Sequence, residues 1–123
     1  MILCDTNILI SSFNGKESSI KQLEIIGLDK IVISAITVME LLQGMGNRQE
    51  LSLMKKKLQF YDVIHLNKEI SSIAISLVEE YKLSHGLQIA DAIIAASAIA
   101  CELPLFTYNL KDFNFIKKLE LYK

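Results

Sequence analysis

The sequence predicts a single α/β domain: a three-layer α/β/α sandwich in which helices cover both faces of a central parallel sheet of about five strands. Short apolar runs alternate along the chain with longer segments whose apolar residues recur at helical spacing. The chain has 123 residues, 51% of them hydrophobic, which is enough for one sizeable core. No repeat, linker or low-complexity tract divides residues 1–123, so we expect one domain.

Five apolar runs are the predicted strands, because each is too short for a buried helix and most are bounded by polar or turn residues. They are residues 2–4 (ILC), 31–33 (IVI), 63–66 (VIHL), 105–107 (LFT) and 119–121 (LEL). Ligands of parallel sheets bind beyond the carboxyl ends of the strands. Polar residues that directly follow a strand are therefore the first candidates for a functional site.

Helical periods occupy the segments between these strands. The clearest apolar stripe comprises Ile70, Ile73, Ala74, Leu77 and Tyr81, and Asn67 is its predicted N-cap. Ser34 is the predicted cap of a second helix. The other stripes are Ile20, Leu23 and Gly27; Val38, Met39 and Leu42; and Leu51, Met54, Leu58 and Tyr61.

The charge balance limits how the chain meets a polyanion. A formal net charge of -1 argues against binding nucleic acid through overall positive charge, so such a partner must contact a local basic patch. Two basic clusters are candidates, although such runs are more often solvated faces. They comprise Arg48, Lys55, Lys56 and Lys57, and Lys111, Lys117 and Lys118.

Several sequence features indicate a cytoplasmic protein. Cys4 and Cys101 lie inside apolar runs without a thiol or histidine at ligand spacing, so we expect both to be core residues in a reducing compartment. The first residues lack a basic leader and a small-residue cleavage site. No uncharged apolar stretch reaches the roughly 18 residues of a membrane span.

Three acids stand at or near predicted strand ends. Asp5 follows the first strand, Glu40 lies in the helix after the second strand, and Asp91 opens the small-residue helix in GLQIADAIIAASAIAC. Each alone has an ordinary explanation. Asp5 and Asp91 are plausible helix caps, and a single Glu within a helix is usually solvated.

Together the three acids point to metal chemistry, because a parallel sheet brings its strand ends to one edge. Converging carboxylates repel one another and raise each other's pKa unless a cation lies among them. Ligands that are all oxygen suit Mg²⁺ or Mn²⁺ rather than zinc. A metal held in this way activates water and stabilises the leaving oxygen of a phosphodiester, so no protein nucleophile is required.

Four stretches of the chain resemble the PIN-domain family, and most closely the VapC-type ribonuclease toxins of type II toxin–antitoxin systems. They are LCDTNILI, SAITVMELLQG, IADAIIAASAIA and LFTYNLKDF, in the family's order and with similar spacing. The resemblance implies a PIN-like fold and a metal-dependent endoribonuclease that acts as a toxin. It also implies a homodimer, a cognate antitoxin partner and an RNA substrate.

The resemblance assigns roles by position. Asp5, Glu40 and Asp91 correspond to the family's acidic metal ligands, and Thr6 and Asn7 correspond to polar residues that support the first acid. The remaining positions stand at the polar end of the fourth predicted strand. They are Thr107, which corresponds to a supporting residue, and Asn109, which corresponds to a catalytic one.

This last stretch departs from the broader family pattern. Many PIN domains carry a fourth acid where this chain has Asn109, which orients water without adding charge. Asp112, three residues later, is either the substitute for that acid or a helix cap. Tyr108 stands where such toxins often have Arg. The phosphate contact of that Arg is then either missing here or replaced by stacking of the Tyr108 ring on an RNA base.

Two other functions fit the sequence less well. One is a PIN-fold RNA-binding or RNA-processing module that does not act as a toxin. The other is a phosphatase or response-regulator-like protein with Asp5 as a covalent nucleophile, but that chemistry generally needs a lysine where this chain has Thr107 and Tyr108. The apolar helices over residues 20–26 and 51–61 are candidates for a dimer face, and His85 is a remote candidate for a substrate contact.

Overall fold

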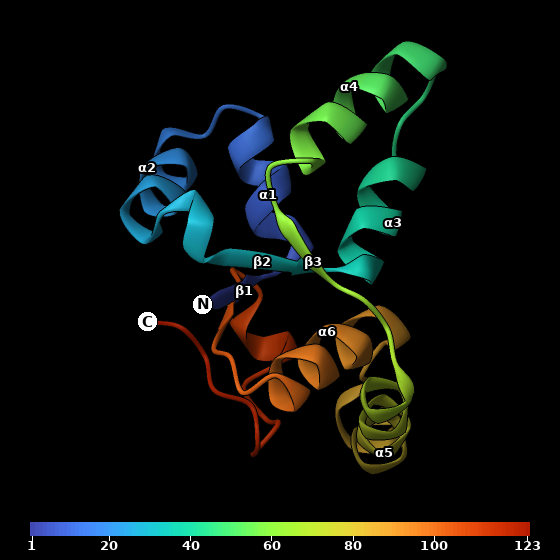
Figure 1. The fold of residues 1–123 in the computed structure, drawn as a ribbon. Coiled ribbons are helices and arrows are strands. Elements are labelled where there is room, and N and C mark those ends of the chain that lie inside the picture. Colours follow the sequence, from blue (N-terminus) through green and yellow to red (C-terminus); the bar gives the residue numbers. More distant parts are fainter.

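The computed structural model describes residues 1–123 and shows strands and helices alternating along the chain (Figure 1). The strands are β1 (Ile2–Cys4), β2 (Ile31–Ser34), β3 (Asp62–Ile64) and β4 (Leu105–Phe106). The helices are α1 (Thr6–Phe13), α2 (Glu17–Ile26), α3 (Ala35–Gln43), α4 (Arg48–Leu58), α5 (Lys68–His85) and α6 (Ile89–Ala100). Two 3-10 turns, η1 (Leu28–Lys30) and η2 (Leu110–Asp112), complete the elements.

The four strands form one parallel sheet in the order β3-β2-β1-β4. Figure 1 shows α1 to α4 above the sheet and α5 and α6 below it. Successive residues of a strand point to opposite faces of the sheet. Leu3 therefore belongs to the core between the sheet and helices α5 and α6. Cys4 belongs to the core on the other face, between the sheet and helices α1, α2 and α4. The predicted three-layer α/β/α class is confirmed.

The predicted fifth strand at residues 119–121 is wrong. Only Leu121 pairs with the sheet, through a single parallel bridge to Leu105. The backbone hydrogen bonds are Leu105 N–H to the Glu120 carbonyl (2.9 Å) and Tyr122 N–H to the Leu105 carbonyl (2.8 Å). Because β4 is only two residues long, it offers the C-terminal segment too short an edge for a longer ladder. The third predicted strand also begins one residue earlier, at Asp62, and ends at Ile64.

Helix caps follow the predictions where a short polar side chain stands before a helix. Asn67 Oδ1 accepts the backbone N–H of Ile70 at 2.8 Å, and Ser34 Oγ accepts that of Ile36 at 3.2 Å. Helix α1, which no predicted stripe covered, begins directly after Asp5. Gly27 ends α2 with a φ of 92°, a conformation that favours glycine, instead of continuing the apolar stripe.

Burial corrects two further predictions. The sequence predicts Met39 on an apolar stripe, but its side chain is 52% exposed. The side of α3 that faces the core is formed by Ala35, Thr37 and Leu41. Cys101 is exposed, whereas Cys4 is buried as expected. Cys101 lies in the turn that ends α6, and this turn is not covered by another element. None of the helices combines the length and apolar composition that a transmembrane span requires.

Candidate active site

Asp5 lies at the carboxyl edge of the sheet, directly after β1, and is only 5% exposed. Its Oδ1 accepts the backbone N–H of Thr6 at 2.8 Å, which makes it the N-cap of α1. Its Oδ2 accepts the hydroxyl of Thr107, just beyond β4, at 2.7 Å. The helix-cap explanation is therefore correct but incomplete, because a residue 102 positions away orients the second oxygen.

The Thr107 hydroxyl is itself oriented. Its oxygen accepts the backbone N–H of Asn109 at 3.0 Å, so its single proton is free to point at Asp5. Parallel pairing of β1 with β4 brings Cys4 opposite Phe106, and the next residues of both strands meet at the same edge. The side chain of Asn109 is exposed.

Two threonines orient Glu40, the acid on α3. The Thr6 hydroxyl donates to Glu40 Oε1 at 2.8 Å and is 2.9 Å from the Thr37 hydroxyl. Each hydroxyl carries one proton, and that of Thr6 is committed to Glu40, so Thr37 is the donor to Thr6. Glu40 is exposed, as a solvated glutamate would be, but its carboxylate is bound to the first residue of α1, next to Asp5.

Thr37 is a site residue that the sequence reasoning missed. Its side chain is fully buried, one turn before Glu40 on the same face of α3. A polar residue three positions before a candidate ligand was the available signal. In a segment as apolar as AITVMELLQG, that signal is weak because a threonine often stands on a helix without any site role.

Asp91 is the third residue of α6, so the prediction that it caps this helix is wrong. Gln88 is the N-cap and makes no side-chain capping bond. Burial raises the pKa of Asp91 to about 6, with further increases from the charges of Asp5, Asp112 and Glu40. The positive end of the helix dipole favours the charged form, but burial and like charges prevail.

The pKa of Asp5 is also raised, mainly by burial. Hydrogen bonds from Thr107 and Thr6 oppose the increase, and the charges of Glu40 and Asp112 add to it. The charges of Glu40 and Asp112 thus raise the pKa of both Asp5 and Asp91. We call these four residues, Asp5, Glu40, Asp91 and Asp112, the acidic cluster.

Asp112 belongs to the cluster through its charge and does not cap a helix. It is the last residue of the turn η2, and its backbone N–H donates to the Asn109 carbonyl at 3.0 Å. Its side chain is exposed. Of the two interpretations of Asp112, the structure contradicts the helix cap and supports a fourth negative charge near Asp5 and Asp91.

Asn7 carries an unusual buried amide on the first turn of α1. Neither its Nδ2 nor its Oδ1 has a hydrogen-bond partner in the protein. Leaving a buried polar group unpaired costs about 1–3 kcal/mol. The amide therefore offers one donor group and one acceptor, two positions after Asp5, that packing alone does not explain.

The residues present fit a hard divalent cation. The cluster offers only oxygen donors, and the nearest thiol is excluded because burial, then the charge of Asp5, raises the pKa of Cys4 to about 12. No three acid, histidine or cysteine side chains stand close enough together to enclose an ion directly. Carboxylates spaced in this way leave room for a cation that keeps several of its waters and takes only one or two carboxylates from the protein.

Two other sequence candidates, His85 and Lys57, have aromatic partners. His85 stacks on Phe115, with ring centroids 4.2 Å apart and planes 9° apart, so it has a packing role. Lys57, at the end of α4, lies 5.1 Å from the centre of the Phe13 ring. Two cavities, of about 390 and 440 Å³, lie along α5, and no residue of the acidic cluster lines them.

The chain is similar to known proteins over nearly its whole length. Ribonuclease VapC1 of Methanocaldococcus jannaschii is 30% identical over 122 residues, which are 98% of this chain and 84% of that protein. A toxin–antitoxin complex from Klebsiella pneumoniae contains a chain with 34% identity and a TM-score of 0.82; the match covers 97% of this chain and 95% of that one.

A third relative is found in VapBC2 from Rickettsia felis, solved bound to a DNA fragment from its promoter. It has 30% identity and a TM-score of 0.82, with 99% of this chain and 98% of that one covered. The family model of the PIN domain matches residues 2–118. The chain therefore belongs to the PIN domain family, among its VapC-type members.

Proposed function

We propose that this protein is a Mg²⁺- or Mn²⁺-dependent endoribonuclease that acts in the cytoplasm as the toxin of a toxin–antitoxin pair. The observation that carries the proposal is the acidic cluster, in which Thr107 orients Asp5 and the Thr37–Thr6 pair orients Glu40. The ribonuclease name of the Methanocaldococcus relative and the toxin–antitoxin complex from Klebsiella support the same reaction and a protein antitoxin as partner.

In this proposal Asp5, Glu40 and Asp91 hold the metal, directly or through its waters, and Asp112 adds negative charge. The bound cation supplies a water of lowered pKa and stabilises charge on the phosphate. Without metal the pKa of Asp91 is about 6, so at neutral pH its carboxylate is mostly ionised and available to bind the cation. Asn7 and Asn109 provide neutral groups that orient water or RNA.

The geometry of Asp5 argues against its use as a covalent nucleophile. It is nearly fully buried, and both of its carboxylate oxygens accept hydrogen bonds. Hydrogen bonds to both oxygens stabilise the carboxylate charge and so reduce its nucleophilicity, and burial restricts the approach of a phosphate to it. Hydrolysis by an activated water is therefore the chemistry that this site favours.

The decisive experiment is incubation of the purified protein with single-stranded and structured RNA in Mg²⁺, in Mn²⁺ and in a chelator. We expect internal cleavage with either metal and none with the chelator. RNA binding without cleavage in every metal would contradict the enzyme and favour the alternative, a PIN-fold RNA-binding module. Co-purification with the product of a neighbouring short open reading frame tests the toxin–antitoxin role.

We also propose that the protein is a homodimer, and two groups of exposed apolar side chains are candidates for its interface. The first group lies on the two helices that the sequence predicts, with Ile25 on α2 and Leu53 on α4. The second, which the sequence did not predict, lies on α5 and α6, where Ile75 is 62% and Ile89 is 71% exposed. Exposed apolar patches of this kind mark interaction surfaces.

Thr37→Val tests whether the buried threonine positions Glu40. Valine matches threonine in shape but removes the donor to Thr6, so the Thr6 proton is no longer directed at Glu40. We expect the Mn²⁺ concentration for half-maximal cleavage to rise by about 10-fold or more, the usual effect of losing a group that orients a ligand. Thr37→Ser should restore the parent value. An unchanged metal requirement in Thr37→Val would contradict the role.

A further inference from the structure

A second feature at the same end of the sheet is a groove of about 340 Å³ beside β4. Among its lining residues are three aromatic ones, Phe106, Tyr108 and Tyr122, and two lysines, Lys16 and Lys123. No acidic side chain lines it. In a chain with a net charge of -1, such a combination of rings and lysines is a local departure from the average surface.

The groove is adjacent to the acidic cluster. Tyr108 directly follows Thr107, whose hydroxyl binds Asp5. The parallel bridge from Leu121 to Leu105 directs the last residues of the chain along β4 toward the same edge. Because side chains alternate along an extended segment, Tyr108 follows Phe106 toward α1 and α2 while Thr107 turns to Asp5.

The ring of Tyr108 is held in place although it is 43% exposed. Its hydroxyl lies 2.6 Å from that of Ser19, which is fully buried on α2 and donates to Ser11 at 3.0 Å. The single proton of Ser19 is thus committed, so Tyr108 is the donor to Ser19. The rings of Tyr108 and Phe106 also pack edge to face, with centroids 5.7 Å apart and an angle of 83° between their planes.

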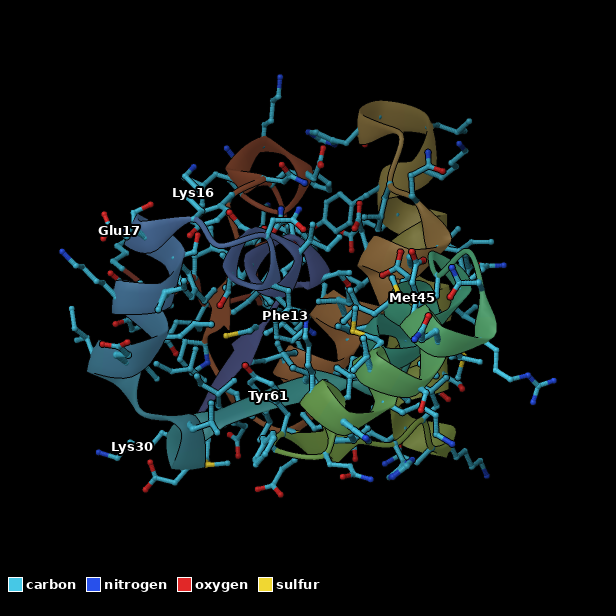
Figure 2. The ribbon with its side chains drawn as sticks, turned by 90° about the horizontal axis from the view of Figure 1, so that it is seen from above. Phe13, Lys16, Glu17, Lys30, Met45 and Tyr61 are labelled. Atoms are coloured by element: carbon cyan, nitrogen blue, oxygen red, sulfur yellow. The ribbon has the colours of Figure 1, made fainter.

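A lysine lies over this fixed ring. Lys16 Nζ is 5.7 Å from the ring centroid, within reach of a cation–π contact. Figure 2 shows Lys16 at the start of α2 with Glu17 beside it, and Lys30 well away from both, in the turn η1 that follows the helix. Glu17 does not line the groove. The groove therefore presents a preoriented aromatic ring beside an exposed positive charge.

We propose that this groove is a nucleotide subsite for single-stranded RNA, in which a base stacks on Tyr108 and a backbone phosphate contacts Lys16. The assignment rests on the proposed function and extends it to the strand next to the cleaved bond. Aromatic rings bind bases of any identity, and lysines bind phosphates, which together are the usual elements of single-strand recognition. A lining without acids and with two lysines suits an anionic strand better than a protein segment.

The test measures binding of a fluorescent single-stranded RNA oligonucleotide to an Asp5→Asn form of the protein, so that cleavage does not interfere. Tyr108→Ala in this form should weaken binding about 5- to 100-fold, from the contribution of one stacked base. Tyr108→Phe, which keeps the ring and loses only the bond to Ser19, should weaken it less. Lys16→Gln should reduce the dependence of log affinity on log salt by about 0.7, the share of one phosphate.

Lys30→Gln is the matched control, because it removes an exposed lysine in the turn η1, beyond the other end of α2 and outside the groove. It should leave both the affinity and its salt dependence at the parent values. Thermal unfolding of each variant establishes that it is folded. If Tyr108→Ala does not fold, Tyr108→Phe and Lys16→Gln decide the question.

The outcomes separate this subsite from the proposed reaction. Cleavage by the unmodified protein together with parent-like RNA binding by Tyr108→Ala and Lys16→Gln would overturn the subsite and leave the groove to a protein partner. The opposite combination is that these variants lose RNA binding while the unmodified protein cleaves no RNA with any metal. It would support the subsite and refute the proposed enzymatic activity.

Discussion

Asp5→Asn is expected to reduce metal-dependent RNA cleavage by about a hundredfold or more. Loss of a group that only orients a metal ligand typically costs roughly 10- to 100-fold, and loss of the ligand itself should cost more. The substitution removes a negative charge at the centre of the acidic cluster. It also changes one of the two oxygens that Thr6 and Thr107 orient. The backbone of α1 is expected to be unaffected, because the amide oxygen still accepts the Thr6 N–H.

The same variant should be at least as stable as the parent in the absence of metal at neutral pH. The pKa of Asp5 is raised, so burial and repulsion outweigh the hydrogen bonds that favour its charged form. A neutral amide avoids that penalty but loses the charged acceptor of the Thr107 hydroxyl. Thermal unfolding and RNA cleavage, measured on the same samples, test both expectations.

Asp29→Asn is the control for Asp5→Asn, since Asp29 is an exposed carboxylate in the turn η1. It should cleave RNA like the parent. Cleavage by Asp5→Asn within a few fold of the parent would refute a role for Asp5 in holding the metal. A variant that loses activity only because it unfolds would be recognised by its melting curve.

Stabilisation by Mn²⁺ is expected to be strong at pH 7.5 and to decline as the pH falls through about 6. The pKa of Asp91 is about 6 in the folded protein, against an ordinary value of 3.8. Protons therefore compete with the metal for this carboxylate in the mildly acidic range. At ten times its dissociation constant the metal contributes about 1.4 kcal/mol, or an increase of about 5 °C in Tm.

Without metal, the contribution of Asp91 to stability changes with pH in the opposite direction. A carboxyl whose pKa is raised on folding binds more protons in the folded state, so its contribution to stability is favourable at low pH and is lost between about pH 4 and pH 6. Asp91→Asn should therefore be more stable than the metal-free parent at pH 7.5, and this advantage should shrink toward pH 4. It should also lose most of the stabilisation by Mn²⁺.

Melting curves of the parent and Asp91→Asn at pH 4 to 7.5, with Mn²⁺ and with a chelator, test both statements. Glu79→Gln, on the exposed face of α5, is a control for the loss of a negative charge. A Tm increase with Mn²⁺ that is equal at pH 5 and pH 7.5 would contradict a metal site that contains Asp91.

The placement of Asp5 could be predicted because it depends on local signals. An apolar run of three residues indicates where a strand ends, and a polar residue next to it is then at the sheet edge, as Asp5 is. The prediction failed for residues 119–121, where the apolar pattern was present but the neighbouring strand β4 was too short to pair with it. Strand formation is a property of two segments, and the sequence pattern describes only one.

The sequence by itself determined the α/β architecture, the caps of α3 and α5, and the family, because periodicity, capping residues and motifs are read from neighbouring positions. Only the tertiary structure decided that Thr107 orients Asp5, that Thr37 acts through Thr6 on Glu40, and that Ser19 holds Tyr108. These bonds join residues 31 to 102 positions apart. A hydroxyl carries one proton, and its direction depends on which distant oxygen packing brings within about 3 Å, which no local pattern encodes.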